Sequence, residues 1–309
     1  MHESAVTFGC QSLVGVLCEP SQASVNGTAV VFVNAGSTPR SGPNRLYTTL
    51  ARRLANRGCA SLRFDISGIG DSPTAAGLGK FRNYAARQVQ EAIDYLHIKG
   101  YRQIVILGLC GGADIAFDAG ATDERIAGLI LVNGAFVDGD VFADLYHKAS
   151  RRTTNRFYTA RLFSPRRWWR LVTFQSQFWK RLTRRKEFSP PTPPPCGPSG
   201  GLPCGQPTAG MASEDSKHKW ETLARRQADV LMIYSEGSVF WDIYKAVNKN
   251  FLAAHYPAGR LTVVFHTNAD HTFTLLSAQE RLANRIEQWL DALSACHDTT
   301  EHVAVGNNR

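Results

Sequence analysis

Short, continuously apolar segments alternate with amphipathic segments of helical period along most of this 309-residue chain. The apolar segments predict strands at residues 28–34, 60–65, 103–109, 126–132, 230–234 and 261–266, after two short strands within 5–18. The amphipathic segments predict helices at residues 44–57, 81–99 and 275–293, and one that begins within 111–119. Strands that are apolar on both faces pack between two layers of helices. We therefore expect the α/β class, with a mostly parallel central sheet covered by helices.

The alternation is interrupted between Gly139 and Asp229. Within this interruption, residues 151–188 hold twelve Lys and Arg but one acidic residue, and residues 189–207 hold eight of the fourteen prolines. A proline- and glycine-rich stretch of this kind predicts a loop or a polyproline-like connector. We expect one α/β domain, made of residues 1–138 and 229–309. Residues 139–228 would be a helical cap inserted into it, with a Pro/Gly-rich loop at 189–210.

The basic residues of 151–188 are interleaved with nine aromatic residues, a pattern with more than one interpretation. The simplest is an amphipathic helix pair that turns its aromatic side chains inward and its arginines to solvent. The alternative is a site for an anion or an acidic protein. Nucleic acid is not favoured as a partner.

The remaining composition narrows the class of protein. No uncharged apolar run reaches the ~18 residues of a membrane span, and the N-terminus has no secretory pattern. Seven scattered cysteines favour reduced thiols, and thus a cytoplasmic protein. Cys196 and Cys204 have no further ligands at zinc spacing, and Gly68 and Gly70 do not open a phosphate-binding helix, so neither metal nor cofactor is expected.

A candidate nucleophile lies where the strand 103–109 runs into a helix. The sequence at 108–112 is Gly-Leu-Cys-Gly-Gly, which is the G-x-S-x-G nucleophile elbow with cysteine in place of serine. The tight turn requires small residues two positions before and two after Cys110. Amides at the start of the following helix can stabilise an oxyanion. Glycine-rich turns are also common in α/β sheets without any catalytic role.

A candidate base follows much later in the chain. His271 lies after the last predicted strand and before the last predicted helix, where it can reach back over the carboxyl edge of the sheet. The order of a nucleophile, an acid and a late histidine is that of the α/β hydrolases. His266, at the end of the same strand, is interpreted as structural.

Five stretches of the sequence together resemble α/β hydrolases that carry a cysteine at the elbow, in particular those associated with exosortase systems and the thioesterase- or acyltransferase-like proteins of biosynthetic clusters. The stretches are residues 34–36, 40–45, 62–72, 108–112 and 270–273. The resemblance covers roughly residues 1–135 and 229–295, and it implies that Cys110 is the nucleophile and His271 the base.

The same resemblance implies further roles. The oxyanion would be held by the backbone N–H of Gly111 and by that of Gly36 or Ser37. Arg40, Arg45 and Arg63 match arginines of the family. For these, ion pairing with Asp65 or Asp71 is favoured over contact with substrate. Arg40, Arg45 and Trp241 are nevertheless the candidates for binding substrate.

The acid of the triad is not settled by the sequence. Relatives have an aspartate at the position that Ser238 occupies here. Asp242 is the first candidate for this role and Glu236 the second, and the third possibility is a Cys-His dyad, because a thiol needs less help to ionise than a hydroxyl.

The choice of cysteine favours one class of substrate. Transfer of an acyl group from a thioester to a thiol costs little free energy, whereas forming a thioester from an unactivated ester or amide is uphill. We therefore expect an acyltransferase or thioesterase acting on acyl groups bound to CoA or to an acyl carrier protein. The alternatives are a hydrolase of activated esters or lactones, as in dienelactone hydrolases, and a catalytically decayed binding or scaffold protein.

Overall fold

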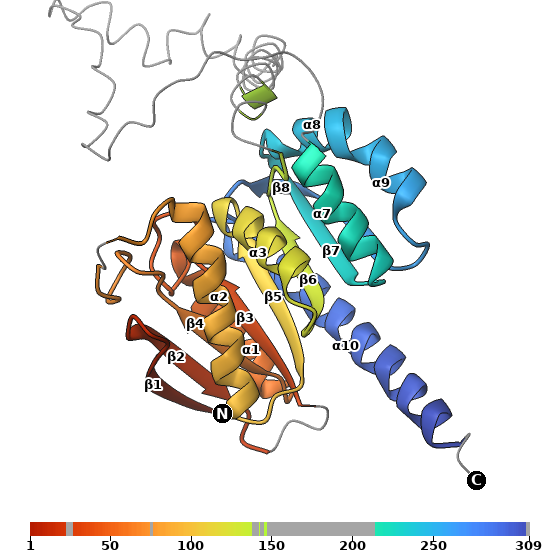
Figure 1. Ribbon diagram of the computed structural model, residues 1–309. Coiled ribbons are helices and arrows are strands. Elements are labelled where there is room, and N and C mark those ends of the chain that lie inside the picture. The colour runs from red at the N-terminus through yellow and green to blue at the C-terminus, as the bar shows by residue number, and fades with distance from the viewer. Residues whose placement is uncertain (23–26, 75–76, 138–141, 143–144, 147–213, 307–309) are drawn as a thin grey trace, which may run out of the picture. The chain divides into compact units, whose positions relative to one another are not determined.

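In the computed structural model, one eight-stranded sheet runs through the described part of the chain in the order β1-β2-β4-β3-β5-β6-β7-β8 (Figure 1). The strands are β1 (His2–Phe8), β2 (Leu13–Glu19), β3 (Thr28–Val33), β4 (Ala60–Phe64), β5 (Gln103–Leu109), β6 (Ile126–Val132), β7 (Asp229–Gly237) and β8 (Leu261–Asp270). The six strands from β4 to β8 in this order are parallel, and β1 and β2 extend the sheet in antiparallel fashion. The predicted α/β class and mostly parallel sheet are confirmed.

The structure describes residues 1–22, 27–74, 77–137, 142, 145–146 and 214–306. The chain divides into two units, one formed by Met1–Asp138 and Met211–Arg309 and the other by Gly139–Gly210. The cap insertion expected at residues 139–228 stays a prediction. The basic aromatic segment 151–188 and the Pro/Gly-rich loop 189–210 lie outside the described residues.

Helices cover both faces of the sheet, as Figure 1 shows. α1 (Leu46–Asn56) and α10 (Leu276–Gly306) share one core with alternate residues of the strands, among them Phe32, Leu107 and Ile233. α2 (Phe81–Ile98), α3 (Gly111–Thr122) and α7 (Glu214–Arg225) cover the other face. Because the central strands β3, β4, β5 and β6 are buried almost throughout, both faces of the sheet are withdrawn from water at its centre.

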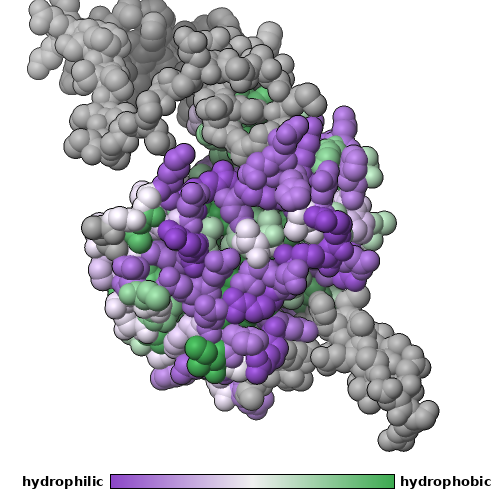
Figure 2. All heavy atoms as spheres, viewed as in Figure 1, coloured by the Kyte–Doolittle hydropathy of each residue, from purple (hydrophilic) through white to green (hydrophobic). Residues whose placement is uncertain are grey.

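The predicted helices follow their apolar periodicity. Leu46, Leu50 and Leu54 of α1 are buried, as are Ile93 and Leu96 of α2. The outward surface of the helices in the view of Figure 2 is largely hydrophilic. No helix among the described residues combines the length and apolar character that a membrane span requires.

The region between β7 and β8 differs from the prediction. It contains α8 (Phe240–Ile243), the π-helical turn η2 (Tyr244–Asn248) and α9 (Lys249–His255), which the sequence pattern does not predict. β8 continues beyond the predicted end to Asp270, where it pairs with Gly237 after a register shift. His266 therefore lies within an edge strand rather than at its end.

Candidate active site

The backbone at Cys110 has the strained geometry of a nucleophile elbow. Its φ and ψ are 57° and −128°, and α3 begins at the next residue. The Cys110 N–H donates to the carbonyl of Val132, 2.9 Å away, which ties the turn to the neighbouring strand β6. Non-glycine residues seldom adopt such a conformation, and where they do it is often at a functional site.

The two flanking glycines are required by close backbone contacts. A Cβ on Gly108 would lie 2.1 Å from the carbonyl oxygen of Gly112, and a Cβ on Gly112 would lie 2.4 Å from that of Asn34. Both distances are well below van der Waals contact. The small residues predicted around Cys110 are thus a steric condition of the turn.

The candidate oxyanion donors lie beside each other. A Cβ built on Gly111 would be 3.9 Å from the backbone nitrogen of Gly36, which lies just after β3 and has φ +61°. The turn closes with a hydrogen bond from the Thr38 N–H to the Ala35 carbonyl. No hydrogen bond between described residues engages the N–H of Gly36 or of Ser37. The backbone of Gly111 therefore lies beside that of Gly36.

A buried carboxylate holds the loop that carries Gly36. Asp65 is fully buried and forms an ion pair with Arg40, whose guanidinium also pairs with Asp71 at 2.6 Å. Asp65 accepts from the Arg40 N–H at 2.6 Å and from the Asn34 amide at 3.3 Å. Arg40 therefore has the structural ion pairs that the sequence favours for it. Arg63 does not, because its guanidinium binds Glu3 at 2.7 Å instead of either predicted aspartate.

His271 is held by two side chains at the carboxyl edge of the sheet. The hydroxyl oxygen of Ser238 lies 3.1 Å from Nδ1 of His271. The amide of the buried Asn133, which follows β6, donates to the His271 carbonyl at 2.8 Å. The ring of Phe240 stacks on the imidazole with 5.3 Å between centroids. The hydrogen bond to Nδ1 fixes the ring and leaves Nε2 as its free nitrogen.

Neither predicted carboxylate makes this hydrogen bond. Asp242 forms an ion pair with Lys245 at 2.7 Å. Glu236 accepts from the N–H of Asn268 at 2.9 Å and is exposed. The side chain hydrogen-bonded to Nδ1 of His271 is the hydroxyl of Ser238, at the position where the resemblance leads us to expect the acid.

The surroundings of Cys110 and His271 favour their neutral forms. Burial raises the pKa of the Cys110 thiol, and the charge of Asp114 raises it further, against the effect of a hydrogen bond from the Gly111 N–H. Burial lowers the pKa of His271, which the charge of Asp270 only partly opposes. With a raised thiol pKa and a lowered imidazole pKa, the resting pair is a neutral thiol and a neutral imidazole rather than a thiolate–imidazolium ion pair. In keeping with this, no hydrogen bond between described residues joins Cys110 to His271.

The comparisons with known proteins agree with this geometry. A family model described as serine aminopeptidase, S33, matches residues 28–191, which is more than half of the chain. The chain belongs to this family of α/β hydrolases. Cys110 stands at the elbow of this hydrolase, where the name of the family implies serine. A search of curated proteins finds no match.

Solved structures show the same fold at low sequence identity. The α/β hydrolase GrgF from Penicillium sp. sh18 is 18% identical, with a TM-score of 0.58 over 96% of this chain and 100% of that one. A dienelactone hydrolase from Anabaena variabilis is 15% identical, with a TM-score of 0.55 over 94% and 97%. A proline iminopeptidase from Mycobacterium smegmatis is also 15% identical, with a TM-score of 0.56 over 95% and 100%. At such identities the likeness establishes the fold alone.

The two other predicted substrate-binding residues lie in different surroundings. Arg45 of the hydrolase begins α1 in a left-handed conformation, with φ 61°. Trp241 is half-buried and packs against Phe265 and Tyr244, with ring centroids 4.9 and 5.4 Å apart. The structure thus places Trp241 in an aromatic cluster beside β7 and β8.

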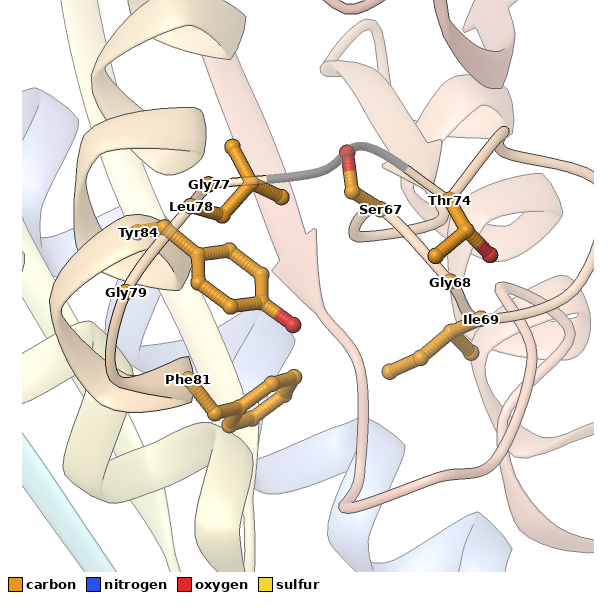
Figure 3. Close-up of a pocket in the computed structure, with 9 residues that line it drawn as sticks. All are labelled: Ser67, Gly68, Ile69, Thr74, Gly77, Leu78, Gly79, Phe81 and Tyr84. Carbon is orange, nitrogen blue, oxygen red and sulfur yellow. The ribbon is translucent and has the colours of Figure 1, made fainter.

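A hollow of about 420 Å³ lies beside the loop that follows β4 (Figure 3). The rings of Phe81 and Tyr84, at the start of α2, stand on one side of it, and Ile69, Ser67 and Thr74 stand on the other. The volume is that of a small-molecule site, and the lining combines aromatic rings with hydroxyls. Because the loop leaves the carboxyl end of β4, this hollow is at the same edge of the sheet as Cys110.

The sequence patterns did not single out Asn133 or Asp114. Asn133 has φ 49° and also accepts from the N–H of Ser235 at 2.9 Å, so it joins the ends of β6 and β7. Its signal in the sequence is an Asn-Gly pair directly after a buried strand. Asp114, one turn after Cys110, accepts from the N–H of Phe136 at 2.8 Å. Burial is the main cause that raises its pKa to about 6.

No group of three His, Cys, Asp or Glu side chains in the described residues is arranged to hold a metal ion.

Proposed function

We propose that this hydrolase transfers or hydrolyses acyl groups through a thioester on Cys110, with His271 as the general base. The observation that carries the proposal is the elbow itself. Cys110 sits in a strained turn at the start of α3, and the backbone of Gly111 lies beside that of Gly36. A nucleophile next to convergent N–H donors is the arrangement that acyl transfer requires.

The reaction would proceed in two balanced halves. His271 takes the thiol proton as the sulfur of Cys110 attacks the acyl carbon, and the N–H groups of Gly111 and Gly36 hold the resulting oxyanion. The oxyanion collapses, the bond to the leaving group breaks, and the imidazolium returns its proton to that group. Water or an acceptor alcohol or amine then gives a proton to His271 and attacks the thioester, which releases the acyl group and restores the thiol.

The neutral pair favours an activated acyl donor. Because the Cys110 pKa is raised and the His271 pKa is lowered, little thiolate is present at rest. The Ser238 hydroxyl can accept a hydrogen bond from Nδ1 but carries no charge to stabilise an imidazolium. Such a site suits a substrate whose leaving group departs easily. We therefore favour acyl thioesters of CoA or of an acyl carrier protein.

The direct test is the mass of the intact protein after mixing with a panel of acyl-CoA and acyl-pantetheine thioesters. We expect an acyl adduct on the wild type that is absent from Cys110→Ala. Asp242→Asn is the matched control, because Asp242 pairs with Lys245 and should leave the adduct unchanged. Screening acceptors would then separate a transferase from a thioesterase.

The same experiment distinguishes the other two hypotheses. Turnover of an enol lactone without any adduct or turnover from thioesters would select the hydrolase of activated esters. No adduct and no turnover with either class, together with Cys110 reactivity equal to that of free cysteine, would select the binding or scaffold protein.

A further inference from the structure

A second hollow, of about 510 Å³, lies at the opposite edge of the sheet from β1. One wall is the segment Val263–His266 of the edge strand β8. The other wall is one face of α10, which contributes Arg281, Asn284, Arg285 and Gln288. Their spacing of three, four and seven residues places these side chains on the same side of the helix.

The residues that line the hollow include two arginines, Arg281 and Arg285, and no acidic residue. Arg281 donates to the carbonyls of Thr267 and Asn268, at 3.3 and 3.2 Å, and these acceptors carry no charge. Among the described residues, no hydrogen bond or ion pair engages Arg285. Two like charges four residues apart on a helix repel each other, so the pair costs stability unless something neutralises it.

The nearest acidic residues of α10 point elsewhere. Glu287 forms an ion pair with Arg53 of α1 at 2.7 Å, which places it on the sheet-covering side of the helix. Asp291 pairs with Arg57 of the same helix α1. Glu287 and Asp291 thus pair with α1, and neither lines the hollow.

Two buried polar atoms of the hollow also lack a partner. Nε2 of His266 and Nε of Arg285 are inaccessible to solvent and form no hydrogen bond. Burial lowers the pKa of His266, and the charges of Arg281 and Arg285 lower it further, so the imidazole lies within the field of both guanidinium groups.

We propose that the hollow formed by His266, Arg281 and Arg285 binds a phosphate group, as inorganic phosphate or as a soluble phosphate monoester. A phosphate dianion offers several acceptor oxygens and the charge that two guanidinium groups require, and guanidinium groups bind phosphate with paired hydrogen bonds. The volume accommodates a small organic group in addition to the phosphate. This site is formed by α10 and β8 and does not depend on the reaction at Cys110.

The test uses the full chain, with inorganic phosphate and glycerol 3-phosphate as probes at constant ionic strength. The readout is the Cε1–H resonance of His266, assigned by its loss in His266→Gln. We expect a saturable shift with one-to-one stoichiometry. In Arg281→Gln/Arg285→Gln, the affinity should fall by about tenfold or more, the scale of losing two charged hydrogen bonds.

The control is Arg87→Gln/Arg102→Gln, which also removes two exposed arginines that form no ion pair. It should bind both probes as the wild type does. Equal weakening in the two double variants would mean that the overall basic charge attracts the anion, and would overturn the proposal. A His266 resonance in the wild type that does not move at saturating phosphate would also overturn it, whatever the stability of the variants.

Discussion

The hydroxyl of Ser238 lies behind His271 where a catalytic triad usually places a carboxylate. A hydroxyl can orient the imidazole, but it cannot offset the positive charge that His271 acquires when it takes a proton. Burial lowers the pKa of this imidazole, and the charge of Asp270 only partly opposes that effect. The hydrogen bond with Ser238 therefore orients the imidazole of His271, but it stabilises the protonated imidazolium only weakly.

Replacing Ser238 by aspartate should move the pH profile of the enzyme. His271 acts as a base only when neutral, so its lowered pKa places the acidic limb of kcat/KM below pH 6.5 in the wild type. A carboxylate beside Nδ1 favours the imidazolium and raises that pKa, so the limb of Ser238→Asp should shift to higher pH. Thioester turnover measured between pH 4.5 and 9 checks this.

Ser238→Ala is the control for that shift. It removes the hydrogen bond without adding charge, and should lower the rate by roughly three- to tenfold, the scale of one neutral hydrogen bond, without moving the limb upward. Identical acidic limbs in wild type and Ser238→Asp would show that His271 is not the group that titrates.

Asp114 should limit stability at neutral pH. Its pKa is raised to about 6 in the folded protein against 3.8 unfolded, so the folded state binds more protons between these values. Stability then falls as the pH rises through this window. Asp114→Asn keeps an acceptor for the Phe136 N–H and removes the buried charge. We expect its melting temperature to exceed that of the wild type by roughly 2–4 °C at pH 7.5.

The difference between the two proteins should disappear near pH 4, where Asp114 of the wild type is protonated. Thermal unfolding followed at both pH values tests this. A gain of the same size at pH 4 would assign it to packing rather than to ionisation.

At the residue scale, the sequence predicts the candidate nucleophile and base by number, but it does not predict which side chain lies beside Nδ1 of His271. Cys110 and His271 follow from a motif and a position in the chain. Asp242 is the first candidate for the acid because similar aspartates often follow this turn in the resembling hydrolases, yet its spacing to Lys245 allows an ion pair within one helical turn. Whether Ser238 or a distant acid reaches Nδ1 depends on how β7 and β8 pair beyond their register shift, which no local pattern encodes.

At the scale of elements, the turn from β5 to α3 leaves no room for larger side chains at Gly108 and Gly112. Cys110 is held at positive φ, and the carbonyls of Asn34 and Gly112 occupy the space where side chains would otherwise project. The turn is therefore fixed by contact between β3, β5 and α3 rather than by its own sequence.

Gly112→Ala and Gly111→Ala form a matched pair. The methyl group at 112 would meet the Asn34 carbonyl at 2.4 Å, so this variant should lose the elbow geometry and about a hundredfold or more of the activity, as misplacement of a catalytic group by about 1 Å does. The methyl group at 111 has its nearest contacts at 3.9 Å and should preserve the fold. Circular dichroism and acylation rates measure the two effects, and equal behaviour of the variants would contradict the steric argument.

The positions of strands are predicted best from the sequence where the strand is buried on both faces. β3, β5 and β6 are apolar throughout, and their runs mark them with nearly correct ends. The segment 240–255 was missed because its helices are short and change type at Tyr244–Asn248, which breaks the regular period. Tertiary contacts with β7, such as those of Tyr234 with Trp241 and Tyr244, take the place of that local signal.

For the whole first unit, Trp220 joins the two parts of the chain that the insertion separates. It is buried in α7 and contacts Phe117 of α3 and Phe136 after β6, with ring centroids 4.4 and 5.6 Å apart. It also contacts Tyr256, which follows α9. The residues after position 210 are thus packed directly onto those before 138.

Trp220→Ala should destabilise the protein by about 3–5 kcal/mol, the usual cost of emptying a buried aromatic site. Urea unfolding followed by far-ultraviolet circular dichroism measures it. Trp241→Ala is the comparison, since that side chain is half-buried and its loss should cost less. A larger effect at position 241 would show that the junction does not depend on Trp220.

The position of the two reactive groups along the chain has a consequence for protein synthesis. Residues up to 132 supply β1 to β6 and the Cys110 elbow, whereas His271 is made only after β7 and β8. A nascent chain emerges from the ribosome with its N-terminal part first. The proposed nucleophile, Cys110, is therefore made about 160 residues before the proposed base, His271, and a chain released early would carry the thiol without that imidazole. Under the proposed mechanism, the site therefore contains both reactive groups only after β7, β8 and His271 have been synthesised.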